Sequence, residues 1–455
     1  ESELGAEARD MLRAWEAGDA ATVELWNTMN SWVFSGFDET YESLGVEFDR
    51  VYRESETYLL GKDIVLRGLE DGKFTRAEGG PVVADLDALG MSGEKVLLRS
   101  DGTSVYMTQD LGTAIARFDE FGIDRMVYVV GDEQDYHFQV LFKILDLLRP
   151  GLEQRLSHLS YGMVLLPEGK MKSREGKVVD ADDLVAEMIA LAETEIRVRY
   201  EDAGLTPDDI KHRARVIGLA ALKYYILDFN PRTWVHFDPA KSIDFQGRTG
   251  PYLLYSYARI QSIAREAGGF PELSDDERAI ALRALGTDLE MAVIRELQEW
   301  PRMAELSARL LDPSKITEQL FRISKAFATM YNDRDRHKII EVASPRKEGL
   351  LLLARAVSHA LGTGLAILGI ETLELPEVVP GELLAGLPDR VAGPHRRELL
   401  PGPGRAQMPF RATGDELAEH VVQPVHGGDP LGDDLLTARA EQAQDLHAVV
   451  LGDDL

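Results

Sequence analysis

Apolar residues recur along much of the chain at the three- and four-residue spacing of an amphipathic helix. Residues 1–60 are read as a helical connective segment, and the apolar face of its helix is expected to pack against a core. The residues that define this face are Leu25, Trp26, Met29, Trp32 and Val33. Residues 61–95 are rich in turn sequences such as EDGK, EGG and MSGEK and carry few strong signals.

The pattern changes near residue 96 to short apolar runs that alternate with helical spacing. The runs 96–99 and 104–108 predict two strands, followed by a helix that begins near Asp110. Further runs at 126–130 and 161–166 predict buried strands. Continuous apolar strands that alternate with helices indicate a parallel sheet covered on both faces.

Ligands bind outside the carboxyl ends of the strands in such sheets. The loops after the three predicted strand units are therefore expected to converge on one site. The second of these loops is the polar segment 131–137, which precedes an amphipathic helix closed by Pro150.

Residues 181–375 are dominated by long helical patterns and predict a helical bundle. The most apolar stretch, 349–370, contains Arg355 and His359, so it reads as a helix packed in a core and not as a membrane span. Residues 376–455 are rich in Pro, Gly and Arg without a sustained period, which predicts an irregular tail.

The composition narrows the class of protein only moderately. The chain has 455 residues, of which 44% are hydrophobic and 28% charged, as in an ordinary globular protein. Because it has no Cys, disulfides, cysteinyl metal sites and thiol nucleophiles are excluded. A net charge of -28 argues against nonspecific nucleic-acid binding but allows a local basic groove.

Against this acidic background, one short basic loop follows an apolar run. Lys170, Lys172 and Arg174 lie between Gly169 and Gly176. The loop is either a solvated hairpin turn or a mobile clamp for an anion such as a triphosphate, since positioned cations act where charge develops. A Walker loop is excluded because G-x-x-x-x-G-K-[ST] does not occur, and no metal-ligand histidine pair is found.

Polar residues after the other predicted strands allow two interpretations. Asp110 is either an N-cap of the following helix or a carboxylate that faces a guanidinium or ammonium group. Gly131 allows close backbone approach, and Gln134, Asp135 and His137 supply donors and acceptors. The segment 131–137 is therefore either a functional loop or a solvated turn.

Several segments together resemble the arginyl-tRNA synthetases, which are class I aminoacyl-tRNA ligases. YGMVLLPEGKMKSREGKVV is similar to the family's form of the KMSKS loop. LLRSDGTSVYMTQDLGTAIAR followed by MVYVVGDEQDYHFQVLFKIL resembles its amino-acid-binding half. FQGRTGPYLLYSYARIQSI resembles the start of its DALR-type anticodon-binding domain, and the similarity spans about residues 20 to 375.

The resemblance implies a fold and a division into domains. It implies the C-terminal half of a class I Rossmann-like nucleotide-binding fold, an α/β structure, followed by an all-α DALR-type anticodon-binding bundle. The segments that follow residues 1–60 are then the catalytic half with its KMSKS-like loop at 61–180, a stem-contacting helical linker at 181–244, the anticodon-binding domain at 245–375 and the tail at 376–455.

The resemblance also implies roles for individual residues. Tyr106, Asp110 and Gln134 match positions that hold the arginine side chain, which favours the carboxylate interpretation of Asp110 over the cap. The residues implied at the ATP site are Gly131, Asp135 and His137 in the loop, Met163 and Val164 beside adenine, and Lys170, Lys172 and Arg174 beside pyrophosphate.

In the helical domain, Tyr252, Tyr255 and Arg259 fall on one face of a helix whose first turn contains Pro251. Aromatic rings beside a guanidinium suit unstacked anticodon bases. The alternative is an amphipathic helix with tyrosines in its core; with the resemblance, contact with tRNA is the preferred interpretation.

The implied activity is that of an arginine–tRNA ligase. Its substrates are ATP with Mg²⁺, L-arginine and the tRNA for arginine, with no metal held by the protein itself. We expect a monomer in the cytoplasm without a membrane span.

The sequence departs from the family pattern in two places that bear on activity. No H-x-G-H motif occurs, and the first His is His137, so the N-terminal half of the nucleotide fold is expected to be missing. The basic loop reads Lys-Met-Lys-Ser-Arg over 170–174 in place of K-M-S-K-S. The alternative function is therefore a non-catalytic tRNA-binding module derived from a class I synthetase.

Overall fold

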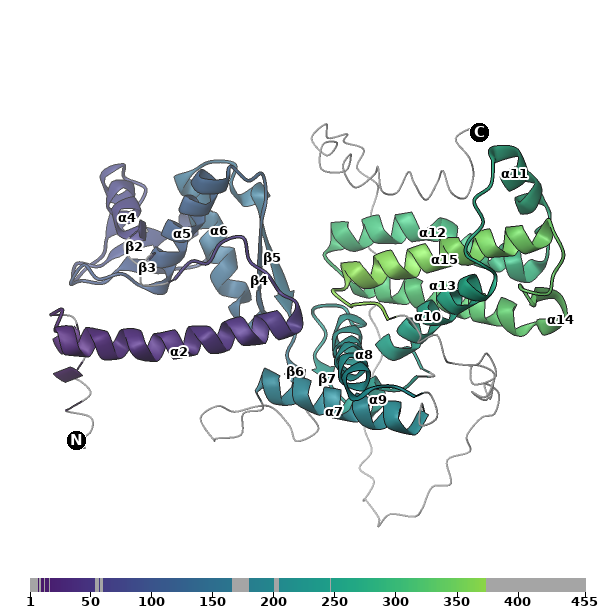
Figure 1. Ribbon diagram of the computed structural model, residues 1–455. Helices are drawn as coiled ribbons and strands as arrows, with labels where there is room; N and C mark the ends of the chain where they lie inside the picture. Colours follow the sequence, from purple (N-terminus) through teal and green to yellow (C-terminus); the bar gives the residue numbers. More distant parts are fainter. Residues whose placement is uncertain are drawn as a thin grey trace, which may run out of the picture.

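The fold is seen in a computed structural model, drawn in Figure 1. The structure describes residues 17–53, 60–165, 180–199, 204–245 and 247–373, with residues 7, 10, 11, 13–15 and 57. The basic loop residues Lys170, Lys172 and Arg174 and the predicted tail over 376–455 lie outside this described part.

The long helix α2 (Ala20–Leu44) precedes the first sheet in the chain and runs below the α/β part in the view of Figure 1. Asp19 caps its start by accepting a hydrogen bond from the Thr22 N–H at 3.0 Å, and Gly45 ends it in the left-handed region at φ 66°. The expectation that its apolar face packs in a core is wrong for the described residues, because none of its residues is buried. Trp32, for example, is 69% exposed.

The segment predicted to be rich in turns contains a helix and a small sheet. Helix α4 (Leu60–Glu70) is followed by an antiparallel sheet with the strand order β1-β2-β3. Its strands are β1 (Thr75–Arg76), β2 (Val82–Asp85) and β3 (Glu94–Leu98).

Residues 104–108, predicted to form the second strand, contain the start of a helix instead. Helix α5 (Tyr106–Phe121) begins four residues before Asp110, with Val105 at the N-cap position. The Val105 N–H donates to Thr108 Oγ1 at 3.1 Å, and this local bond favours a helical turn over an extended strand. The N-cap interpretation of Asp110 is therefore wrong, since that residue lies inside the helix.

A parallel strand pair forms the sheet that leads to the site. β4 (Met126–Gly131) pairs with β5 (Leu156–Tyr161) in continuous register, and α6 (Asp135–Leu148) makes the crossover between them. The predicted strand at 161–166 is displaced, because the polar sequence LSHLSY forms β5 and only the short β6 (Val164–Leu165) follows.

The expectation that both faces of this sheet are covered is also wrong for the described residues. Met126, Tyr128 and Val130 belong to the core beneath α5 and α6. Val127 and Val129, on the opposite face of the same strand, are 36% and 61% exposed.

The remainder of the described chain is helical apart from β7 (Val235–His236), which pairs with β6. The long helices are α7 (Ala181–Arg199), α8 (Pro207–Leu227), α10 (Gly250–Glu266), α12 (Asp288–Leu310), α13 (Ser314–Asn332) and α15 (Arg346–Ile367). Shorter elements are α9 (Pro239–Ser242), α11 (Asp275–Arg283), α14 (Arg334–His337) and the 3₁₀ turns η1 (Asp87–Leu89), η2 (Asp132–Gln134) and η3 (Glu153–Arg155). The predicted helical bundle is confirmed.

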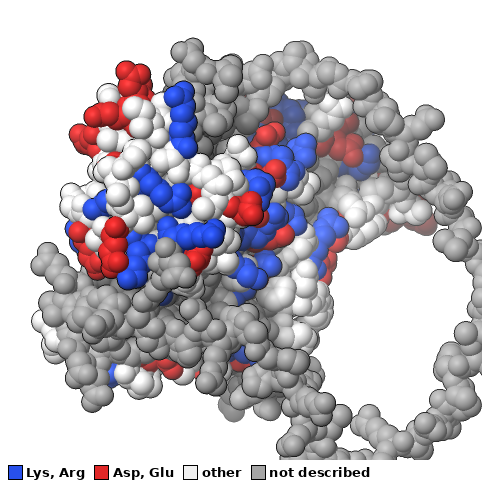
Figure 2. Space-filling view, turned by 90° about the vertical axis from the view of Figure 1, so that its right-hand side faces the viewer, with Lys and Arg blue, Asp and Glu red and all other residues white. Residues whose placement is uncertain are grey.

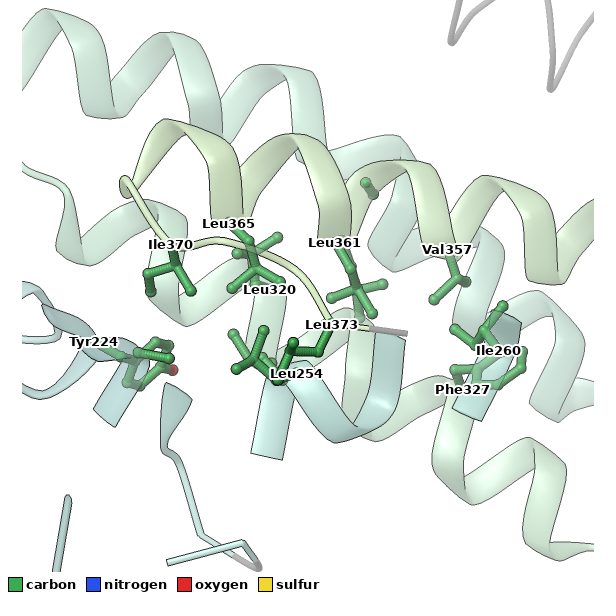
Figure 3. Packing of buried hydrophobic residues seen from close by; sticks show 14 of the residues in the cluster. Tyr224, Leu254, Ile260, Leu320, Phe327, Val357, Leu361, Leu365, Ile370 and Leu373 are labelled. Atoms are coloured by element: carbon green, nitrogen blue, oxygen red, sulfur yellow. The ribbon is translucent and has the colours of Figure 1, made fainter. Parts of the chain in front are cut away.

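Helix α15 lies at the centre of the helical core. Figure 3 shows Val357, Leu361 and Leu365 of α15 facing Leu320 and its neighbours from α13 and α10. By length and composition α15 could cross a membrane, but most of its residues are buried within the protein. The interpretation of 349–370 as a core helix is confirmed.

A buried ionic cluster joins the ends of three helices in this core. The Glu290 carboxylate accepts hydrogen bonds from the N–H groups of Gly286 at 2.7 Å and Thr287 at 2.8 Å, and it also contacts Arg346. His337 Nε2 lies 3.3 Å from its other oxygen, and both side chains are fully buried. Burial by itself raises the pKa of Glu290, but the two backbone donors and Arg346 outweigh it, so the pKa is lowered.

We expect Glu290→Gln to lower the free energy of unfolding by about 3 kcal/mol at pH 7, because it leaves the guanidinium of Arg346 without the carboxylate that it contacts. A carboxyl whose pKa is lowered in the folded state stabilises the protein above its unfolded pKa and loses that effect as the pH falls. The difference between wild type and variant should therefore shrink below about pH 4.5.

Urea denaturation across a pH series measures this difference. Glu305→Gln serves as the control, because Glu305 is an exposed carboxylate on the same helix. A pH-independent difference for Glu290→Gln would contradict the electrostatic explanation.

Candidate active site

The first turns of α5 present two candidate side chains. Tyr106 and Asp110 are four residues apart, which places them on one face of the helix. Tyr106 is 77% exposed and the Asp110 side chain 42%, so both can reach a ligand.

Asp110 is held by a residue from the neighbouring loop. His137 Nε2 lies 2.7 Å from Asp110 Oδ2, and the His137 side chain is 19% exposed. His137 lies in the first turn of α6, directly after the polar loop that follows β4. The structure therefore brings the Asp110 carboxylate of α5 next to the loop that contains Gly131 and Gln134; the third loop expected at this site, the basic loop, lies outside the described residues.

A second histidine supports the same loop and was missed from the sequence. His158, in the middle of β5, places Nε2 2.9 Å from the Val130 carbonyl oxygen and Nδ1 3.2 Å from Asp135 Oδ1. Asp135 is thus anchored to the sheet, whereas Gln134 at the end of η2 is exposed. A lone His in the sequence LSHLSY gives no signal of this role, because its partners come from other elements.

A partly buried tyrosine, Tyr128 on β4, interacts electrostatically with the Asp110 carboxylate. Burial raises the pKa of Tyr128 to about 12, and the negative charge of Asp110 adds to the effect while Arg117 opposes it. Tyr128 therefore stays neutral at physiological pH, so it adds no negative charge beside Asp110.

The loop after β4 is also tied to a segment about one hundred residues later. The Trp234 indole N–H donates to Asp132 Oδ2 at 2.8 Å. The Gly162 N–H donates to the Pro231 carbonyl at 2.8 Å, next to the same segment. These bonds hold the end of β5 against residues 231–234, and no local sequence pattern predicts them.

The expected adenine contacts lie on β6 and just before it. Val235 N–H donates to the Met163 carbonyl at 3.0 Å, and Val164 pairs with Val235 in the β6–β7 ladder. Met163 and Val164 are therefore fixed by backbone pairing, and both are partly buried. The basic loop that begins shortly after them lies outside the described residues.

The three residues expected to contact tRNA all lie on α10 and are partly buried. The Tyr252 ring lies 5.7 Å from that of Phe321. The Arg259 guanidinium lies 4.7 Å from the ring centroid of Tyr255 and 5.7 Å from that of Tyr331. Their contact with tRNA stays a prediction.

Within the part of the chain that the structure describes, no group of three or more His, Asp or Glu side chains is placed to hold a metal ion.

Comparison with known proteins agrees with this arrangement. Residues 1–238 match the family described as tRNA synthetases class I (R), catalytic domain, and residues 253–375 match the DALR anticodon binding domain. Arginine–tRNA ligase of Porphyromonas gingivalis is 46% identical over 376 residues, and that of Parabacteroides distasonis is 45% identical over 375 residues. Each match covers 82% of this chain and 62% of the relative.

Two solved structures share the fold. Arginyl-tRNA synthetase of Thermus thermophilus superposes with a TM-score of 0.66 at 22% identity, covering 82% of this chain and 69% of that one. The enzyme of Plasmodium falciparum gives 0.67 at 18% identity, covering 82% and 62%.

The two family matches, together with the α/β part and the helical bundle, define the class: a class I synthetase catalytic region followed by an anticodon-binding domain, as expected. More particularly, this chain belongs to the arginyl-tRNA synthetase family. It spans about three fifths of the length of the curated relatives it matches.

Two glycines beside the site should respond differently to substitution. A Cβ at Gly162 would lie 2.6 Å from the Thr233 carbonyl oxygen, whereas a Cβ at Gly131 would meet nothing nearer than Tyr161 at 3.8 Å. We expect Gly162→Ala to lower the free energy of unfolding by about 2 kcal/mol, because backbone must move. Gly131→Ala should change it little, since φ is -59° there.

Urea denaturation of both variants measures the two effects. Similar losses for both, or none for Gly162→Ala, would contradict the tight packing of β5 against residues 231–234.

Proposed function

We propose that this chain is the part of an arginine–tRNA ligase that binds L-arginine and carries the anticodon-binding domain. The observation that carries the proposal is the half-exposed Asp110 carboxylate, bound by His137 at the carboxyl end of the parallel strands. Membership of the arginyl-tRNA synthetase family supports it.

The arginine side chain is proposed to bind at Asp110. Among the described residues, His137 is the sole hydrogen-bond or ion-pair partner of that carboxylate, and it contacts only Oδ2. Oδ1 is therefore available to a guanidinium, whose planar fork of N–H donors matches a carboxylate. Tyr106 and Gln134, both exposed, supply further polar contacts.

ATP is proposed to bind between the loop after β4 and the segment around β6. Gly131 lets a phosphate or ribose approach the backbone, and Asp135, held by His158, and His137 line the site. Met163 and Val164 offer backbone to adenine. Lys170, Lys172 and Arg174 are proposed to neutralise the pyrophosphate group, and Mg²⁺ enters with the phosphates of ATP.

The proposed reaction has two steps. The carboxylate of arginine attacks the α-phosphorus of ATP, an O–P bond forms, and the bond to pyrophosphate breaks. A terminal ribose hydroxyl of tRNA then attacks the carbonyl of the arginyl adenylate, loses its proton and releases AMP. Binding at Asp110 fixes the position of the reacting carboxylate, so the chain contributes positioning and charge stabilisation.

Recognition of tRNA is proposed for the helical domain. Residues 247–373 contain 17 Lys and Arg and 17 Asp and Glu, so this domain is neutral although the whole chain carries -28. Figure 2 looks onto the side of the molecule that lies at the right in Figure 1, where the helical domain is. On this face Lys and Arg side chains lie across the middle and are interspersed with acidic ones. The phosphate backbone of a tRNA is thus repelled less by this domain than by the acidic remainder of the chain. Tyr252, Tyr255 and Arg259 are proposed anticodon contacts, and a cytoplasmic monomer is the expected form.

We expect Asp110→Asn to weaken the binding of L-arginine by about 100-fold, because a neutral amide replaces the anion that pairs with the guanidinium. Isothermal titration calorimetry measures this change. L-citrulline, in which a urea replaces the guanidinium, should bind weakly to both proteins and to a similar extent.

Asp124→Asn is the matched control, since Asp124 is an exposed carboxylate in the loop before β4. Unchanged arginine affinity in Asp110→Asn would overturn the assignment of the pocket.

The activity itself is tested by arginylation of tRNA with ATP and Mg²⁺. Because no H-x-G-H motif occurs, we expect little charging by this chain alone. Charging should appear when the chain is co-expressed with the part of the Porphyromonas gingivalis enzyme that it does not match. Charging by the chain alone would overturn the expectation of an incomplete catalytic site.

No charging in either arrangement, together with retained binding of tRNA in a filter assay, would favour the alternative function of a non-catalytic tRNA-binding module. The absence of the motif is the observation that keeps this alternative in view.

A further inference from the structure

Trp234 is an exposed aromatic residue to which the proposed function assigns no role. Its side chain is 45% exposed, although tryptophan is on average largely buried in folded proteins. It lies directly before β7, and its indole N–H bonds to Asp132 in the turn after β4. A large aromatic surface is therefore exposed to solvent at the carboxyl end of the parallel strands, beside the proposed ATP site.

The position of this indole is fixed by contacts on two sides and by the main chain next to it. At one edge, its N–H donates to Asp132 Oδ2 at 2.8 Å. Its Cδ1 lies 2.8 Å from where a Cβ on Gly162 would stand, so the ring packs against the backbone at that glycine. The Val235 N–H donates to the Met163 carbonyl at 3.0 Å. Because the ring is held before a ligand arrives, little side-chain freedom is lost on binding.

The charge of the neighbouring loop favours a neutral base over a phosphate as the partner of this ring. Asp132, Glu133 and Asp135 place three carboxyl groups in the turn after β4 and at the start of α6. Carboxylates repel the phosphates of a nucleotide. A nucleobase is neutral and flat, and it gains affinity when it stacks on an aromatic side chain.

We propose that Trp234 is a stacking platform for an adenine ring, supplied by ATP or by the terminal adenosine of tRNA. The expected adenine contacts Met163 and Val164 pair with Val235, the residue that follows this tryptophan. Their backbone groups are available to the edge of the base, and the indole is available to its face. The inference rests on the proposed function, since that reaction brings an adenine to this site.

Fluorescence of the purified chain tests the proposal, because a base stacked on an indole quenches its emission. We expect ATP, or an RNA acceptor hairpin that ends in CCA, to quench the emission of the chain. Trp234→Phe should remove this quenching. Trp32→Phe is the matched control and should leave it unchanged, since Trp32 is a 69% exposed tryptophan on α2.

A second hairpin that lacks only the terminal adenosine distinguishes the two sources of the base. Quenching by the complete hairpin and not by the shortened one assigns the stack to tRNA. Quenching by ATP assigns it to the nucleotide substrate.

Binding affinities separate stacking from a structural role of the same side chain. Trp234→Leu should weaken binding of the quenching ligand about tenfold, because the stack of one base is lost. Trp234→Phe should retain most of the affinity, since a phenyl ring still stacks although it cannot donate to Asp132. Inorganic tripolyphosphate, which has no base, should bind equally to wild type and Trp234→Leu in calorimetry. Circular dichroism should show both variants folded, because the side chain is exposed.

No quenching by either ligand would overturn the proposal. So would equal losses of affinity in Trp234→Leu and Trp234→Phe, because both lack the N–H and such a result would indicate that the residue only anchors Asp132. Binding of ATP and of the hairpin that is insensitive to both substitutions would overturn the stack and leave the proposed function standing. Quenching that depends on Trp234, together with unchanged arginine affinity in Asp110→Asn, would count against the proposed arginine pocket and leave the stack standing.

Discussion

The helical part of this protein depends on the burial of α15. A helix that is apolar around most of its circumference has to be enclosed on all sides. Helices α10, α11, α12 and α13 pack around it. Close approach occurs at Gly364, where a Cβ would lie 2.5 Å from a methyl group of Leu320, so a larger residue there would force Leu320 to move. The buried Glu290 cluster then holds the start of α15 against α12 and α14.

In the α/β part, only some of the apolar surfaces are buried. Its core lies between the antiparallel sheet, α4, α5, α6 and one face of the β4–β5 pair. None of the residues of α2 is buried, and Val127 and Val129 on the other face of β4 are exposed. The α/β part therefore leaves two apolar surfaces exposed among the described residues.

Polar contacts complete the site between these two parts. His137 and His158 fix Asp110 and Asp135, while Trp234 fixes Asp132 from a distant segment. The carboxylate proposed to bind arginine is thus held by a histidine that is less exposed than the carboxylate itself. Because such a group is positioned before a ligand arrives, less ordering is needed on binding.

The sequence by itself determined the elements whose patterns are long or whose motifs are specific. The helical bundle, the core position of α15, strand β4 and the family were predictable because apolar periodicity and quoted motifs report directly on them. The start of α5 was missed, since the bond between Val105 and Thr108 outweighs an extended pattern over 104–108. Strand β5 was misplaced because its sequence is polar and the partners of its central histidine, His158, lie on β4 and α6.

Only the tertiary structure decided which apolar faces are covered and which side chains meet. Helical spacing in α2 indicates an apolar face but not what packs against it, and burial depends on segments distant in the chain. The pairings of Asp110 with His137, of Asp135 with His158 and of Asp132 with Trp234 join residues 27, 23 and 102 positions apart. Such contacts are products of the fold, because no local periodicity or propensity encodes the distance between residues so far apart.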